Sequence, residues 1–268
     1  MNPRLRINYQ KSDSLKVISL LTETANLKTK PDNWMIWFGN KLAGIPYVGG
    51  TLDRTSEEEL IINLRELDCT TFVEQVLALS ECASKGKETF NSFVNALIHV
   101  RYVDGKVEYV NRQHYFTVWI NDNEKEGLVK SISPNPPFTA VQHVSINYMS
   151  THTGSYKMLT AHPEWTDGIR QLEQSVSGKS YRYIPKSNIV NTKLMRSTVH
   201  TGDIIAIITN KKGLDTTHIG IAIWHKDGLH LLNASSIHKK VIDEPMLLRT
   251  YMMKHPVQIG IRIARPIL

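Results

Sequence analysis

The chain has 268 residues, of which 41% are hydrophobic and 21% charged, so it can bury a substantial core and extended disorder is not expected. Its net charge of +7 favours an anionic partner such as nucleic acid, an acidic membrane surface or an acidic polymer, although a mildly basic surface would give the same balance. No stretch reaches the roughly 20 apolar residues of a membrane span, and the first six residues lack a signal-peptide apolar region.

The first ninety residues carry helical patterns. One helix is expected from the polar residues at 12–14 to about Leu27, and a second at about 32–42, after the break at Pro31. A short helix is expected at 57–64.

The strongest helical pattern starts near Asp68 and ends at Gly86. Asp68 or Thr70 can cap its N-terminus, and Thr71 with Glu74 matches a capping box. Cys69 therefore lies at or next to a helix N-terminus.

The middle of the chain, about 100–200, has a different character. Asp104-Gly105 predicts a hairpin turn within 101–110, and residues 114–120 have a strand-like composition. Residues 150–200 are polar with few periodic signals. We therefore expect an insertion or lid at about 100–200.

The last third is predicted as a series of strands at 203–209, 218–224, 229–234 and 257–264. Asp227-Gly228 is expected to form the turn between the second and third of them. Helices followed by antiparallel strands predict an α+β fold. The chain is interpreted as a single domain, 1–268, with N-terminal helices at about 12–45.

The chain has two cysteines, Cys69 and Cys82. Both fall in the helix predicted after Asp68, about 20 Å apart at 1.5 Å per residue, which is too far for a disulfide. Free N–H groups at a helix N-terminus should lower the pKa of the Cys69 thiol and can bind a developing oxyanion. Cys69 is the candidate nucleophile, whereas Cys82 is expected to be a core residue.

His218 is the candidate base, because it opens a strand in which Gly220 and Ala222 share its face. These small residues should leave room for the helix that carries Cys69. Alternatively, His218 is an ordinary histidine at a strand end.

Asn233 is the candidate residue that orients His218, because a polar amide on an apolar strand face needs a partner. A two-residue turn at Asp227-Gly228 would pair it with Ala222, about 13 Å from His218. A bulge or a wider loop would bring it closer; otherwise Ser235 would take the role.

Three sequence segments resemble the NlpC-type cell-wall peptidases, a papain-like superfamily of cysteine hydrolases. They are Gly44-Ile-Pro-Tyr-Val-Gly-Gly50 with Asp68-Cys-Thr-Thr-Phe-Val-Glu74, then Gly202-Asp-Ile-Ile with His218-Ile-Gly-Ile, then Leu231-Leu-Asn-Ala-Ser-Ser236. The strings at 63–74, 112–116 and 231–236 are more specifically similar to the N-acetylmuramoyl-L-alanine amidase-like subgroup. This resemblance extends from about residue 30 to the C-terminus.

The resemblance implies a papain-like core and an amidase that separates the muramoyl lactyl group from L-alanine, with a preference for anhydro-muropeptides. It implies Cys69 as nucleophile, His218 as base and Asn233 as the third polar residue. It also implies that Tyr47, together with the Cys69 N–H, binds the oxyanion. The chain differs from the superfamily in a longer segment between Gly50 and Asp68, and in having asparagine where histidine is common.

The expected substrate is a muropeptide, whose free carboxylates should be bound by basic and aromatic residues. The candidates for this contact are Arg112, His114, Tyr115 and Ser235; the first three could equally be ordinary strand surface. No metal or other cofactor is expected, and no nucleic-acid motif is present. The resemblance implies export, with a signal segment outside this sequence, and a monomer is expected; a cytosolic location remains an alternative.

Three alternative functions stay open. The same fold could cleave the stem peptide as a γ-D-glutamyl endopeptidase. The positive charge could belong to a non-catalytic module that binds anionic glycan or nucleic acid. His152, His162 and other histidines could serve a zinc hydrolase, but HExxH and metal-ligand spacing are absent.

Overall fold

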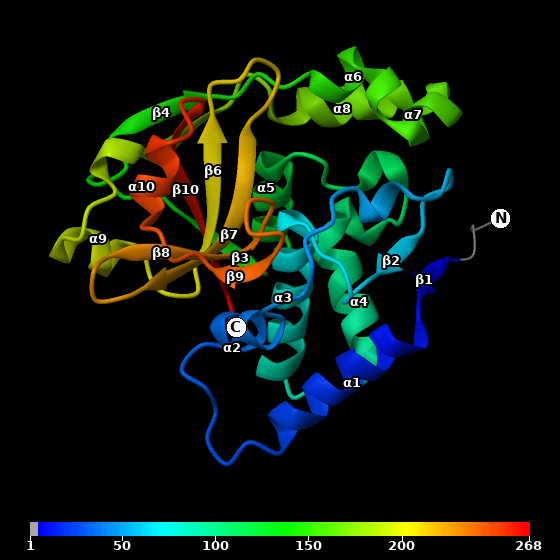
Figure 1. The fold of residues 1–268 in the computed structure, drawn as a ribbon. Helices are drawn as coiled ribbons and strands as arrows, with labels where there is room; N and C mark the ends of the chain where they lie inside the picture. Colours follow the sequence, from blue (N-terminus) through cyan, green and yellow to red (C-terminus); the bar gives the residue numbers. More distant parts are fainter. Residues whose placement is uncertain (1–4) are drawn as a thin grey trace.

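An eight-stranded antiparallel sheet runs through the protein, with helices on both of its faces (Figure 1). In this computed structural model, which describes residues 5–268, the strand order is β4-β5-β10-β6-β7-β8-β9, and β3 pairs with β10. The strands are β3 Val129–Ile132, β4 Ala140–His143, β5 Ser180–Pro185, β6 Ile204–Thr209, β7 Thr216–Trp224, β8 Leu229–Ser235, β9 Lys240–Asp243 and β10 Gln258–Pro266. The expected α+β class is confirmed, and the four strands predicted in the last third lie within about two residues of their expected bounds.

The helices fall into three groups. The first group packs on one face of the sheet or beside it: α1 Lys11–Ala25, α2 Trp34–Lys41, α3 Cys69–Ser84, α4 Phe90–Arg101 and α5 Phe116–Lys125. The second group, α9 Lys193–Thr198 and α10 Leu248–Met253, covers the opposite face. The third group, α6 Tyr148–Thr151, α7 Lys157–Ala161 and α8 Thr166–Val176, projects beyond the sheet (Figure 1).

Shorter elements connect these parts. A parallel pair of strands, β1 Ile7–Tyr9 and β2 Leu60–Ile62, lies beside the first helices. The 3-10 turns are η1 Thr51–Asp53, η2 Val103–Gly105, η3 Tyr109–Asn111, η4 Thr153–Ser155, η5 Pro163–Trp165 and η6 Lys186–Asn188. None of the described helices combines the length and apolar composition that crossing a bilayer requires.

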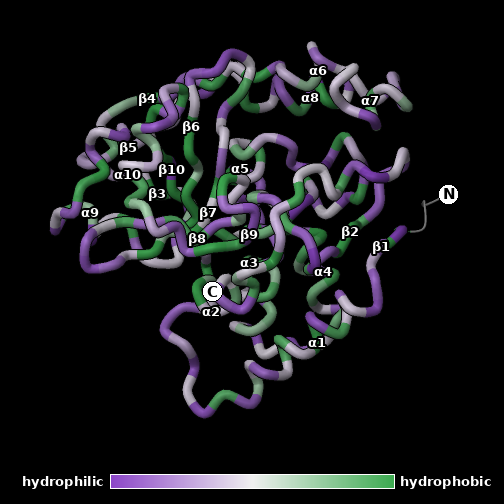
Figure 2. Tube along the Cα trace, viewed as in Figure 1, coloured by the Kyte–Doolittle hydropathy of each residue, from purple (hydrophilic) through white to green (hydrophobic). Residues whose placement is uncertain are grey.

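The sheet divides the apolar core because successive side chains of a strand point to opposite faces. Ile204 and Ala206 of β6 pack with α1–α4, whereas Ile205 and Ile207 pack with α9 and α10. Strand β6, in the middle of the sheet, is accordingly buried along its whole length and is apolar except for its last residue, Thr209 (Figure 2). A third apolar cluster lies between α5 and the α6–α8 group.

Helix α3 is the central element of the first group. All but four of its sixteen residues are buried. Its N-cap is Asp68, whose carboxylate accepts from the Thr71 N–H at 2.8 Å, while the Thr71 hydroxyl accepts from the Asp68 N–H at 3.0 Å. The predicted capping box of Thr71 with Glu74 was therefore wrong, because Glu74 is turned into the core.

A buried ion pair joins α3 to α4. The Arg101 Nε donates to the Glu74 carboxylate at 2.6 Å, and its Nη1 donates to the Ile61 carbonyl of β2 at 2.7 Å. Both side chains are almost fully excluded from solvent. One guanidinium thus connects three separate segments beneath the N-terminal half of α3.

Two element predictions were wrong because long-range contacts outweigh local composition. Residues 57–64 contain the short strand β2 rather than a helix, since residues 60–62 pair with β1. Residues 114–120 hold the start of α5 rather than a strand. A residue far along the chain caps this helix: the Thr117 N–H, in the first turn of α5, donates to the carboxylate of Asp215, 98 residues later, at 2.6 Å. Asp104-Gly105 does form a turn, in η2 directly after α4, but the chain on either side shares only the single antiparallel bridge between Tyr102 and Arg112 instead of a hairpin.

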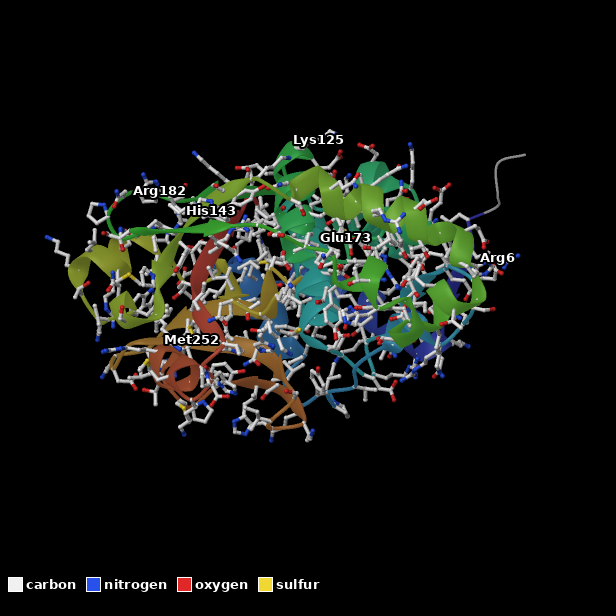
Figure 3. The ribbon with its side chains drawn as sticks, turned by 90° about the horizontal axis from the view of Figure 1, so that it is seen from above. Arg6, Lys125, His143, Glu173, Arg182 and Met252 are labelled. Carbon is white, nitrogen blue, oxygen red and sulfur yellow. The ribbon has the colours of Figure 1, made fainter. Side chains whose placement is uncertain are left out.

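The region predicted as an insertion, about 100–200, contributes to more than one part of the fold. Its α5 packs on the main core, and β4 and β5 extend the sheet beyond β10. The Tyr115 hydroxyl donates to Glu173 of α8 at 2.7 Å and accepts from the Met149 N–H at 2.9 Å, which attaches the α6–α8 group to α5. Figure 3 shows Glu173 on α8, seen from above.

We expect the substitution Arg101→Ala to lower the free energy of unfolding by about 3–5 kcal/mol, because it leaves the Glu74 carboxylate buried without its partner. Lys85→Ala is the matched control: it removes an exposed pair with Glu81 and should cost less than about 0.5 kcal/mol. Urea unfolding monitored by circular dichroism measures both. Equal losses in the two variants would contradict the proposed role of the buried pair.

Candidate active site

Cys69 is the first residue of α3, at the end of the helix that meets the sheet. It is half-buried, and its sulfur lies near enough to the backbone of Ile219 on β7 for that backbone to act on the thiol pKa, lowering it. Among residues 5–268, no protein acceptor takes the Cys69 N–H, as is usual for the first amides of a helix. The thiol therefore lies beside the residue that follows His218, with a free donor next to it.

His218 and Asn233 are brought together on β7 and β8. The His218 Nε2 lies 2.9 Å from the Asn233 Oδ1, and the Asn233 Nδ2 donates to the Leu231 carbonyl at 3.0 Å. That second bond orients the amide so that its oxygen faces the ring. An oxygen acceptor requires the proton on Nε2, so Nδ1 is left as the basic nitrogen.

The turn between β7 and β8 explains how Asn233 reaches His218. Asp227-Gly228 lies in the turn between β7 and β8 as predicted, but the loop spans residues 225–228 rather than two residues: Trp224 pairs with Leu229, and the His225 N–H donates to the Gly228 carbonyl at 2.9 Å. The four-residue loop shifts the register by two residues, so that Asn233 lies opposite Gly220 rather than Ala222.

Gly220 is needed for this close packing. A Cβ placed on it would lie 2.7 Å from the Leu231 Cγ and 3.0 Å from the Asn233 Cβ. A side chain at this position would therefore displace Asn233 from His218.

The expected packing of α3 on the Gly220 face of β7 was wrong. Ile219 and Ile221 face the helices of the first group, and Ala222 faces α10. The side chain of His218 lies near Tyr251 of α10, with 6.3 Å between the ring centroids. No sequence pattern singled out Tyr251, because α10 reaches the site only through the folding of the sheet.

Tyr47 joins the same group of side chains. The Tyr47 backbone N–H donates to the Lys239 carbonyl at 2.9 Å. Tyr47 also forms a parallel β-bridge with Leu67, two positions before Cys69. Burial, followed by the negative charges of Cys69 and Asp68, raises the pKa of Tyr47 to about 12. The phenol is therefore protonated at neutral pH and can donate a hydrogen bond.

Burial acts on both members of the candidate pair. It raises the pKa of the Cys69 thiol to about 12, and the Asp68 carboxylate adds to that shift. Burial also lowers the pKa of His218, which favours the neutral imidazole. The predicted depression of the Cys69 pKa was wrong, since loss of solvation and Asp68 outweigh the helix terminus. The resting site holds a neutral thiol and a neutral imidazole.

A pocket of about 580 Å³ lies next to these residues. It is lined by Ile237, His238, Glu244, Pro245, Met246, Tyr251, Lys254 and His255. Tyr251 connects it to His218, and the charges of His255 and Glu244 act on the His218 pKa. The pocket is therefore contiguous with the candidate base and offers apolar walls with a few charged groups.

The expected substrate-binding residues lie elsewhere or are engaged within the fold. Arg112 is buried and paired with Asp53, and His114 bonds to the Tyr109 carbonyl at 2.7 Å. Tyr115 is buried in the bonds to α6 and α8 described above. The Ser235 hydroxyl accepts from the His238 N–H at 3.1 Å, in the turn after β8. The structure brings Cys69, His218, Asn233 and Tyr47 together. Ser235 lies close to this group, because it pairs with Lys240, which bridges to Pro46 beside Tyr47. Arg112, His114 and Tyr115 are held in the contacts described above.

Comparison with known families identifies the family of this chain. The model of the AmiA-like family, described as N-acetylmuramoyl-L-alanine amidase-like, matches residues 37–261. The chain belongs to this family. The match includes all four residues of the candidate site. No curated protein matches the chain significantly.

Solved structures of similar proteins extend the AmiA-like assignment. An N-acetylmuramoyl-L-alanine amidase from Bacteroides uniformis ATCC 8492 shares 37% identity with a TM-score of 0.82, covering 88% of this chain and 98% of that one. A putative xylanase from Bacteroides fragilis shares 39% identity with a TM-score of 0.79, covering 85% and 98%. A Legionella pneumophila protein, 22% identical over 96% and 95% of the chains with a TM-score of 0.69, has the same fold.

We expect alkylation of Cys69 by iodoacetamide to accelerate with pH beyond 8.5, the value of a free thiol, because the raised pKa keeps the thiolate fraction small at neutral pH. Mass spectrometry of the modified peptide gives the rate. The Cys69→Ala variant reports the background at buried Cys82, whose pKa burial also raises to about 12. A rate that is already constant by pH 7 would indicate a resting thiolate–imidazolium pair and contradict the neutral site.

Proposed function

We propose that this AmiA-like protein is a cysteine amidase that hydrolyses the bond between the muramoyl lactyl group and L-alanine in peptidoglycan fragments, with anhydro-muropeptides as the preferred substrates. The observation that carries the proposal is the arrangement of His218. Its Nε2 is held by Asn233, which leaves Nδ1 basic, and Cys69 lies against the backbone of the next residue. The printed name of the Bacteroides uniformis relative supports the choice of bond.

The proposed reaction begins with proton transfer from the Cys69 thiol to Nδ1 of His218 as the sulfur attacks the lactyl carbonyl carbon. The free Cys69 N–H and the Tyr47 hydroxyl stabilise the oxyanion. The imidazolium then protonates the nitrogen of L-alanine, and the C–N bond breaks. A water molecule, deprotonated by His218, attacks the thioester and releases the acyl group, which restores the thiol.

A papain-like, NlpC-type core is part of this proposal. It is supported by the position of Cys69, at a helix N-terminus that meets an antiparallel sheet, and by His218 and Asn233, which lie on the adjacent strands β7 and β8. Export to the compartment that holds peptidoglycan, and action as a monomer, are further parts of the proposal.

The name of the Bacteroides fragilis relative suggests a second reaction, hydrolysis of a glycosidic bond. That chemistry uses two carboxyl groups on either side of the bond. Here Asp68 caps α3 and Glu244 is paired with His238. The carboxylates near Cys69 are thus engaged in the fold, which favours the thiol and imidazole as the reacting groups.

The decisive experiment is mass spectrometry of digests of anhydro-muropeptides and of intact muropeptides. We expect free peptides that begin at L-alanine with the wild type and with Cys82→Ala, and none with Cys69→Ala. Cleavage after D-glutamate would replace the proposed bond by that of an endopeptidase, and shortened glycan would support the glycosidase. Absence of any product would favour a non-catalytic binding module.

We expect Lys254→Ala to raise KM about threefold to tenfold with a smaller change in kcat, because the pocket beside His218 would lose a cation for a substrate carboxylate. Lys87→Ala is the matched control, since Lys87 is exposed beyond the far end of α3 from Cys69. Steady-state kinetics on one muropeptide measures both variants. An unchanged KM in Lys254→Ala would exclude this lysine from substrate binding.

A further inference from the structure

Two histidines and an aspartate meet at the end of the β7–β8 hairpin. His225 follows β7, His230 lies on β8 and Asp243 ends β9, and one ligand atom from each lies within 4.8 Å of the others. The sequence spacing predicted no metal site, because the three residues reach one another only through the pairing of three strands.

His230 is buried and its ring is held in one orientation. Its Nδ1 lies 2.8 Å from the Glu244 carbonyl, an acceptor, so Nδ1 carries the proton. In the neutral ring, Nε2 then presents a lone pair to the cluster, where the Asp227 carboxylate lies 3.1 Å away. Two acceptors facing each other repel, and either a proton on Nε2 or a cation bound at this position relieves the repulsion. A carbonyl that holds the remote nitrogen of a histidine in this way is usual around metal-bound imidazoles.

Asp243 carries a second unsatisfied oxygen. Its Oδ2 lies 2.7 Å from the His225 Nε2, whereas its Oδ1 is buried without a hydrogen-bond partner among the described residues. A buried carboxylate oxygen without a donor is costly. A bound cation would satisfy it.

We propose that His225, His230 and Asp243 bind a zinc-class divalent cation, with Asp227 or water as the fourth ligand. Imidazole nitrogen and carboxylate oxygen are ligands that zinc accepts in tetrahedral sites. In a tetrahedral site, bonds of about 2.0–2.1 Å from zinc to each ligand atom would place the ligand atoms roughly 3.3 Å apart. The exposed side chains of His225 and Asp227 can adjust to this spacing.

The site is structural rather than catalytic. His225 lies seven residues along β7 from His218, or about 23 Å at 3.3 Å per residue, so a metal there does not reach the thiol. It instead joins the tips of β7 and β8 to the end of β9. The inference is independent of the proposed amidase activity.

The test uses a tag-free, chelator-treated Cys69→Ala protein, so that the thiol with His218 cannot provide a second zinc site. Isothermal titration with zinc chloride should give one equivalent bound, and zinc should raise the melting temperature. His225→Ala and Asp243→Asn should each weaken binding at least about tenfold and lose the rise in melting temperature. Absorption of the cobalt-substituted protein should show tetrahedral coordination.

His143→Ala is the matched control, because His143 is an exposed histidine on β4, bonded to Ser180 and apart from β8 and β9 (Figure 3). It should bind zinc like the Cys69→Ala parent. Melting curves without metal establish that each variant is folded. The proposal is overturned if the parent binds no zinc, or if His225→Ala and Asp243→Asn bind it as tightly as the parent does.

Discussion

The buried contact between Glu74 and Arg101 is the constraint on which the position of the candidate nucleophile depends. Their side chains lose nearly all solvent on folding, and the cost of burying the two charges is offset by their mutual contact and by further hydrogen bonds. The Arg101 guanidinium donates from Nε to Glu74 of α3 and from Nη1 to the carbonyl of Ile61 on β2, whereas Nη2 has no hydrogen-bond partner among the described residues. Because moving either charge away would leave its partner buried and unpaired, the pair constrains the rotation of α3 and the direction of its N-terminus.

The second constraint is the register of β7 with β8. A loop two residues longer than the tightest hairpin places Asn233 opposite Gly220, and the missing Cβ at Gly220 allows the amide to approach the ring of His218. The Leu231 carbonyl then decides which way the amide faces, and thereby which imidazole nitrogen stays basic. The protonation state of the base thus follows from backbone pairing several residues away.

Burial is the third effect, and it favours neutral forms throughout the site. It raises the pKa values of Cys69 and Tyr47 and lowers that of His218. A neutral pair costs less to keep in a partly dry site than an ion pair does. In the proposed reaction, charge would develop only as the thiol attacks, and the Cys69 N–H and the Tyr47 phenol would be the donors available to stabilise it.

The sequence alone determined the features that depend on neighbours close along the chain. The helix after Asp68 follows from its apolar period and its cap, and the strands from β6 to β8 follow from apolar runs, so Cys69 at a helix N-terminus and His218 and Asn233 on neighbouring strands were predictable. The tertiary structure decided what depends on distant partners. Asp215 accepts from the Thr117 N–H and so stabilises the start of α5 within 114–120. Pairing with β1 makes a strand of residues 60–62. The position of α10 in the fold brings Tyr251 to His218. The pKa of Cys69 also depends on distant partners. The helix terminus alone predicted a lowered thiol pKa, but the burial of Cys69 by the whole fold raises it.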